Sequence, residues 1–118
     1  MAAKVLIADD EKDIRDLLVK FLVKNGFETR PVDSGMEALK AIRNDPSFDV
    51  LVLDNRMPGI NGTEVIRELE KSEKRIPVIM LTGMAVPQED YMKADATLRK
   101  PIDLNELMTK IKEVLRKQ

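Results

Sequence analysis

The sequence predicts an α/β domain built on a doubly wound, five-stranded parallel sheet. Short apolar runs alternate with segments of helical spacing along all 118 residues. The strongest runs, residues 5–8, 50–53 and 78–81, are continuous and rich in β-branched side chains, as in strands covered on both faces. Strand-then-helix units in a chain of this length favour right-handed crossovers and one domain, which we expect to span residues 1–118.

Two weaker runs, residues 28–32 and 97–99, complete the expected strands and suit the edges of the sheet. Between the strands, apolar residues spaced three and four apart mark the buried stripes of the first and last helices. These residues are Ile14, Leu17, Leu18, Phe21 and Leu22, and Leu104, Leu107, Met108, Ile111 and Leu115. Met36 and Met80 are also assigned to the core.

The expected helix starts carry side chains that accept hydrogen bonds from free backbone amides, with an acid three residues later. The pairs are Asp10 with Asp13, Ser34 with Glu37, Asn61 with Glu64, and Asp103 with Glu106. Gly26 follows the first helix and suits a left-handed backbone stop.

Composition excludes several kinds of chemistry. The chain has no cysteine and no histidine, which rules out disulfides, thiolate nucleophiles, Ser-His-Asp catalysis and the usual zinc sites. The formal net charge of −1, with acids and bases mixed along the chain, argues against a nucleic-acid surface. No apolar run approaches membrane-spanning length and no signal peptide opens the chain, so we expect a cytoplasmic protein.

Polar side chains stand at the ends of four expected strands: Asp9 with Asp10, Asp54, Thr82 and Lys100. In an open parallel sheet such ends meet at one edge, where ligands bind. Three carboxylates close together repel one another unless a cation lies between them, and Mg²⁺ prefers such oxygen ligands. Asp54 could then attack phosphorus to form an aspartyl phosphate, with the metal, Thr82 and Lys100 sharing the charge.

Most of these residues also have a purely structural interpretation. Asp10 could cap the first helix, which is compatible with metal binding. Asp54 could initiate the turn that follows it, Thr82 could be an ordinary strand end, and Lys100 could be a surface lysine. Asp9 has no such alternative. The occurrence of all the polar strand ends together favours the site.

At these residues the chain resembles the receiver domain of response regulators in two-component signalling, of the chemotaxis-regulator type. The resemblance covers essentially the whole sequence and rests on Asp9-Asp10, residues 53–59 with Gly62, Leu81-Thr82-Gly83 and Lys100-Pro101. It implies a flavodoxin-like sheet of strand order 2-1-3-4-5. It also implies transfer of a phosphoryl group from a histidine kinase or a histidine phosphotransfer protein to Asp54.

The same resemblance implies a Mg²⁺ site made by Asp10, Asp54 and the backbone carbonyl of Arg56, with Asp9 assisting directly or through water. Thr82 would bind a phosphoryl oxygen and Lys100 would pair with the phosphoryl group. The peptide bond between Lys100 and Pro101 would be cis.

Three features depart from the family pattern. The switch position three residues before the lysine, usually aromatic, is Thr97. The stretch between Thr82 and Lys100 is shorter than usual by roughly one helical turn, which leaves residues 87–94 for a shortened fourth helix. Thr97 and the shortened helix both fall on the face that, in this family, normally reports phosphorylation. Asn55, where an apolar residue is common, is a smaller departure.

The sequence therefore predicts a phosphorylation switch that catalyses only its own phosphorylation and dephosphorylation. A phosphatase of the haloacid-dehalogenase kind is one alternative, but it needs a second acid where this chain has Arg56. A receiver-fold module that signals without phosphate is another, favoured by Thr97 and the short fourth helix. We expect no output domain within the chain, which suits either a stand-alone regulator or part of a longer protein. The downstream target stays open.

Overall fold

The computed structural model describes residues 2–56, 59–72, 75–83 and 94–117. The elements in these ranges are, in order, β1 (Lys4–Ala8), α1 (Lys12–Lys24), β2 (Glu28–Val32), α2 (Gly35–Asn44), β3 (Val50–Asp54), α3 (Gly62–Glu70), β4 (Val78–Thr82), β5 (Ala96–Arg99) and α4 (Leu104–Arg116). The shortened helix expected at residues 87–94 falls almost entirely outside the described residues. The label α4 therefore belongs to the C-terminal helix.

The described strands form one five-stranded parallel sheet in the order β2-β1-β3-β4-β5. This confirms the predicted sheet and its strand order. The two weaker runs, β2 and β5, lie at the edges as expected. Ala8 is in register with Leu53, and Asp54 with Leu81, so the carboxyl ends of the central strands reach the same edge.

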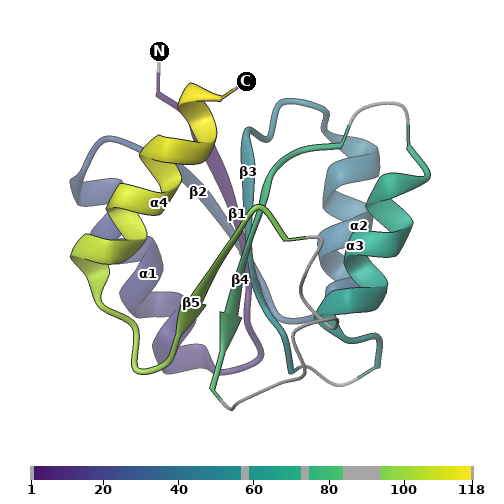
Figure 1. The fold of residues 1–118 in the computed structure, drawn as a ribbon, viewed down its shortest axis with the longest axis horizontal. Helices are drawn as coiled ribbons and strands as arrows, with labels where there is room; N and C mark the ends of the chain where they lie inside the picture. The colour runs from purple at the N-terminus through teal and green to yellow at the C-terminus, as the bar shows by residue number, and fades with distance from the viewer. Residues whose placement is uncertain (1, 57–58, 73–74, 84–93, 118) are drawn as a thin grey trace.

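Helices cover both faces of the sheet, with α1 and α4 on one side and α2 and α3 on the other (Figure 1). Residues that alternate along each strand feed two separate apolar clusters, one under each helix pair. In β3, for example, Leu51 and Leu53 pack towards α2 and α3, whereas Val50 and Val52 pack towards α1 and α4. This double burial explains why the central strands are continuously apolar.

Three of the four predicted helix caps are confirmed. Ser34 accepts a hydrogen bond from the Glu37 amide, Asn61 and Glu64 form a reciprocal capping box, and Asp103 accepts from the Glu106 amide. Gly26 has φ +90° just beyond the end of α1, which confirms the predicted left-handed stop.

The predicted cap at Asp10 is wrong. Helix α1 begins at Lys12, with Glu11 at the N-cap position, and Asp10 is exposed before it. The reason lies one residue earlier, because the Asp9 carboxylate accepts a hydrogen bond from the Glu11 amide at 2.9 Å. That bond turns the chain so that the helix starts later than the sequence pattern suggests.

Two residues assigned to the core are exposed instead: Leu17 by 51% and Met36 by 48%. On α1, Leu18 and Leu22 provide the fully buried positions, and Leu17 lies beside that narrower stripe. On α2, it is Gly35 that faces α3. A Cβ atom on Gly35 would lie 2.7 Å from Val65 Cγ2, so the first turn of α2 approaches α3 through its backbone and Met36 is left outside.

Gly62, the first residue of α3, allows a close approach to β4. A Cβ atom there would lie 2.7 Å from the Met80 sulfur and 3.1 Å from Asn55 Cα, and Met80 is fully buried. We expect Gly62→Ala to lower the free energy of unfolding by about 1–3 kcal/mol, as overpacking of a dense core does. Urea denaturation followed by circular dichroism measures this change.

Gly83→Ala is the matched control for that experiment. Among the described residues, the nearest atom to a Cβ at Gly83 is Lys100 Cδ at 3.9 Å, an ordinary contact distance, so the free energy of unfolding should change little. Equal destabilisation by both substitutions would contradict the packing argument at Gly62.

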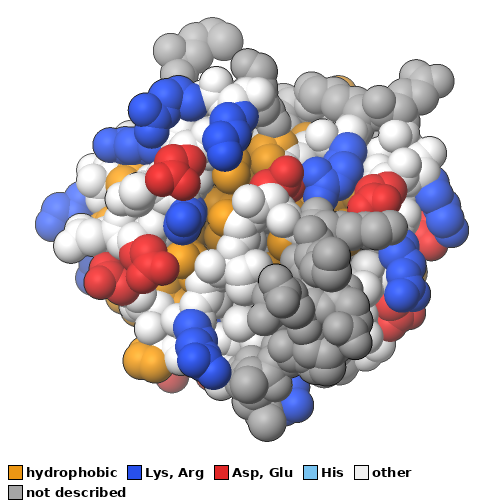
Figure 2. Space-filling view, viewed as in Figure 1, with side chains coloured by type: hydrophobic (Ala, Val, Ile, Leu, Met, Phe, Trp, Pro, Cys, Tyr) orange, Lys and Arg blue, Asp and Glu red, His pale blue; other side chains and the backbone are white. Residues whose placement is uncertain are grey.

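Acidic and basic side chains are interspersed on the face of the molecule seen in Figure 2, in keeping with the mixed charges of the sequence. Among the described helices, none combines the length and the apolar character needed to cross a membrane.

Candidate functional site

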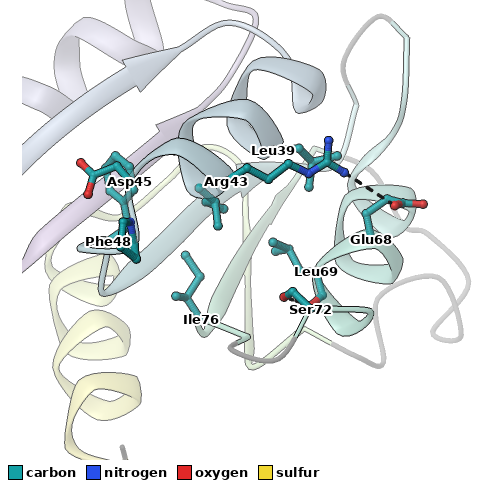
Figure 3. A pocket seen from close by; sticks show the side chains of 10 residues that line it. Leu39, Arg43, Asp45, Phe48, Glu68, Leu69, Ser72 and Ile76 are labelled. Atoms are coloured by element: carbon teal, nitrogen blue, oxygen red, sulfur yellow. Dashed lines mark hydrogen bonds and ion pairs between the residues drawn. The ribbon is translucent and has the colours of Figure 1, made fainter.

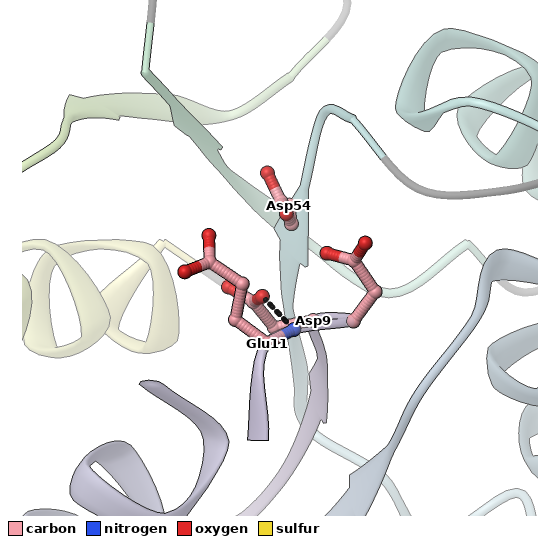
Figure 4. A group of neighbouring side chains, drawn as sticks. Asp9, Glu11 and Asp54 are labelled. Carbon is pink, nitrogen blue, oxygen red and sulfur yellow. Dashed lines mark hydrogen bonds between the residues drawn. The ribbon is translucent and has the colours of Figure 1, made fainter. Parts of the chain in front are cut away.

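The polar strand ends come together at the carboxyl edge of the sheet, as the sequence predicted. Asp9 follows β1 and is fully buried, while Asp54 ends β3 and is 4% exposed. Their side chains, with that of Glu11, gather above the ends of β1 and β3 (Figure 4). Carboxylate oxygens of Asp9, Asp10, Glu11 and Asp54 all lie within 4.8 Å of one another.

Lys100 brings a positive charge into this acidic cluster from the end of β5. Its Nζ atom lies between three carboxylates: 3.3 Å from Asp9 Oδ2, 3.4 Å from Asp54 Oδ2 and 3.3 Å from Glu11 Oε1. Its backbone amide donates to the Thr82 carbonyl at 2.7 Å, which ties the end of β5 to that of β4. The Lys100-Pro101 peptide bond is cis, as expected.

The cluster changes the proton affinity of its members. Burial, together with the nearby charge of Asp9, raises the pKa of Asp54 to about 6, although Lys100 and the Arg56 amide act in the opposite direction. Burial opposes the charge on Lys100, yet the carboxylates of Asp54 and Asp9 raise the pKa of this lysine. Asp54 is therefore mostly ionised at neutral pH, but its negative charge is poorly compensated.

The chemistry of the cluster fits Mg²⁺. Within the part of the chain that the structure describes, four carboxylates gather here and three of them pair with the Lys100 ammonium, and all of the candidate ligand atoms are hard oxygens. Among the described residues, Asp9 Oδ2 is buried without a hydrogen-bond partner, because its ion pair with Lys100 lacks hydrogen-bond geometry. A buried carboxylate oxygen without a hydrogen-bond donor is costly, and a bound metal ion would offset that cost.

The other predicted residues lie nearby. The Arg56 amide donates to Asp54 Oδ1 at 3.3 Å, and ligation of a metal by the Arg56 carbonyl remains a prediction. Thr82 is 8% exposed at the end of β4. Thr97, the predicted switch position, lies in edge strand β5 in register with Met80 and is partly buried.

Two residues of the site were missed in the sequence analysis. Glu11 contributes a fourth carboxylate, and Arg15 donates from Nη1 to the Asp9 carbonyl at 2.8 Å. Only their positions in the sequence could have indicated that these two residues belong to the site: Glu11 directly follows the acid pair, and Arg15 lies one helical turn later. Neither fact reveals which way a long side chain turns.

The pH dependence of stability provides a test of this electrostatic arrangement. In metal-free protein, the raised pKa of Asp54 means that ionising this residue costs more in the folded than in the unfolded chain. Its contribution to stability is therefore present below its ordinary pKa of 3.8 and is lost as the pH rises through about 6. Asp54→Asn should stabilise the protein by about 1–3 kcal/mol at pH 7.5, and by far less at pH 4.

Urea denaturation in EDTA at both pH values measures this difference. Mg²⁺ should narrow the difference in stability between Asp54→Asn and wild type at pH 7.5, because the metal stabilises the wild-type cluster more than that of the variant. A variant that is less stable than wild type at pH 7.5 without metal would contradict the assignment of Asp54 as a buried acid whose charge is poorly compensated.

A separate cavity of about 180 Å³ lies between the C-terminal ends of α2 and α3, near the amino ends of the strands (Figure 3). Its walls are mainly apolar, including Leu39, Phe48 and Ile76, and an Arg43–Glu68 ion pair at 3.9 Å crosses its rim. The acidic cluster lies at the other end of the strands.

The fold and the acidic edge together define a doubly wound α/β domain with a site suited to a divalent cation and an anionic group. The sequence matches the family model for the response regulator receiver domain over residues 5–112. The chain belongs to this family, whose domains are signalling switches of two-component systems that bind Mg²⁺ in an acidic pocket.

Similar proteins agree with this assignment. Response regulator MprA of Mycobacterium ulcerans is 34% identical over 121 residues, a match that covers 99% of this chain and 52% of MprA. Response regulator SaeR of Staphylococcus aureus is 32% identical, with 94% of this chain and 50% of SaeR covered. The chain thus spans about half the length of the curated relatives it matches.

Among solved structures, response regulator protein TrrA of Thermotoga maritima, in complex with Mg²⁺-BeF, is 34% identical with a TM-score of 0.87. That match covers 95% of this chain and 98% of TrrA.

Proposed function

We propose that Asp54 accepts a phosphoryl group from a histidine kinase or a histidine phosphotransfer protein, in a reaction that requires Mg²⁺. The observation that carries the proposal is the position of Asp54. It is a nearly buried carboxylate at the end of a central strand, within 3.4 Å of an ammonium and beside a second buried acid. The TrrA complex with Mg²⁺-BeF supports the proposal by similarity.

In the proposed reaction, an ionised Asp54 oxygen attacks phosphorus, the bond from phosphorus to the donor nitrogen breaks, and the imidazole of the donor takes up a proton. Lys100 pairs with an oxygen of the transferring group, and the Thr82 hydroxyl donates to another. Asp10, Asp54 and the Arg56 carbonyl would hold Mg²⁺, with Asp9 assisting directly or through water. When bound, the metal would neutralise part of the negative charge on the phosphoryl group.

The proposal extends to the output of the switch. Phosphorylation would alter protein contacts through Thr82 and the Thr97 position on β5. Because Thr97 is small where the family usually has an aromatic side chain, the movement at this position would be small. The downstream partner is a protein target or a fused output domain, and residues 1–118 form the receiver unit.

The stoichiometry of phosphoryl uptake distinguishes this switch from a phosphatase. With acetyl phosphate and Mg²⁺, we expect no more than one phosphoryl group per chain, and no sustained turnover of a chromogenic phosphate ester. Many turnovers of the ester per chain would instead support a phosphatase. No uptake at all would favour a receiver-fold module that signals without phosphate.

A further inference from the structure

The side chain of Glu11 makes an unusual contact for a residue at the start of a helix. It stands at the N-cap position of α1, yet its side chain makes no capping hydrogen bond. Short polar side chains at that position normally accept a bond from the first helical amides. The longer side chain of Glu11 extends instead to Lys100, where Oε1 lies 3.3 Å from Nζ and joins residues 89 positions apart.

Lys100 is shared between carboxylates of two kinds. Asp9 and Asp54 are buried, with side chains 0% and 6% exposed, so both are enclosed by neighbouring atoms. The Glu11 side chain is 60% exposed and stands at the rim. The flexible stem of lysine allows its ammonium to favour one partner over another.

We propose that Glu11 is a positioning residue that holds Lys100 while Asp54 is unmodified and competes with the phosphoryl group for it. This inference rests on the proposed function of Asp54. An arriving phosphoryl group brings up to about two negative charges, which attract Lys100 and repel Glu11. Glu11 would therefore weaken binding of the phosphoryl group, because both compete for the Lys100 ammonium.

The affinity for beryllium fluoride at saturating Mg²⁺, measured by calorimetry, tests the competition. Glu11→Gln should bind it about two- to fivefold more tightly than wild type, the range expected for a partly exposed ion pair. Asp13→Asn is the matched control, because it removes an exposed acid from the same helical turn. Unchanged or weaker binding in Glu11→Gln, or an equal gain in the control, would overturn the inference.

Two further measurements separate a positioning role from a metal ligand. Without metal, brief treatment with acetic anhydride should modify Lys100 faster in Glu11→Gln than in wild type, with the other lysines as internal references. An unchanged rate would overturn the inference. The Mg²⁺ affinity of Glu11→Gln should fall by no more than about fivefold, the effect of removing a nearby but exposed charge. A clearly larger loss would make Glu11 a ligand and overturn the competing role.

These results also distinguish failure of this inference from failure of the proposed function. If wild type does not bind beryllium fluoride with Mg²⁺, the phosphoacceptor assignment of Asp54 fails, and the competing role of Glu11 fails with it. If wild type binds it and Glu11→Gln behaves like wild type, only the role of Glu11 is wrong.

Discussion

Asp54→Asn should lose all detectable labelling by acetyl phosphate. Asparagine has nearly the same shape as aspartate, so the packing at the end of β3 is retained. Its amide, however, lacks the negative charge and the nucleophilic oxygen that attack on phosphorus requires. Among the described residues, Asp9 is the other buried acid, but it is fully shielded from solvent, whereas Asp54 keeps a small exposed fraction through which a phosphodonor can approach. Phosphate-affinity electrophoresis measures the labelled fraction.

Asp13→Asn is the control for this loss. Asp13 is exposed in the first turn of α1, so its removal changes the net charge equally while leaving the described contacts of Asp54 in place. We expect this control to be labelled like wild type. Labelling that persists in Asp54→Asn would place the acceptor on another residue.

Lys100→Ala should have the second-largest effect, a loss of about 10- to 100-fold in affinity for beryllium fluoride at saturating Mg²⁺. This corresponds to the removal of one hydrogen bond to a charged group, about 1.5–3 kcal/mol. Binding of Mg²⁺ alone should be unchanged or tighter, because the ammonium that opposes the cation within the acidic cluster is gone. Calorimetric titration of each ligand separates the two effects.

The fold should survive the loss of Lys100, because its side chain contacts the site and belongs to neither apolar cluster. The far-ultraviolet circular dichroism spectrum of Lys100→Ala should therefore match that of wild type. Lys112→Ala, which removes an exposed lysine of α4, should change neither affinity. A lost dichroism signal, or weaker Mg²⁺ binding in Lys100→Ala, would contradict the role assigned to Lys100.

The sheet could be predicted from the sequence because each central strand is apolar on both faces. A continuous run such as residues 50–53 has few alternatives in a chain with clear helical stripes on either side. The site followed from the same pattern. Once the strands are parallel, the residues at their carboxyl ends must lie at one edge, so Asp54 and Lys100 meet although they are far apart in sequence.

Details that depend on single side chains could not be predicted in this way. The start of α1 was misplaced because the Asp9 carboxylate bonds the Glu11 amide, a choice made by local geometry. The exposure of Met36 depends on how closely Gly35 approaches α3, which no spacing rule specifies. The contact from Glu11 to Lys100 depends on a side-chain direction that sequence periodicity does not contain.

The central claim is that Mg²⁺ and Asp54 act together in accepting a phosphoryl group. Intact-mass analysis after treatment with acetyl phosphate, with and without Mg²⁺, tests it most directly. We predict one added phosphoryl group on wild type with Mg²⁺, and none when EDTA replaces the metal. Equal labelling with and without Mg²⁺ would contradict the account, as would an unlabelled wild-type protein in the presence of the metal.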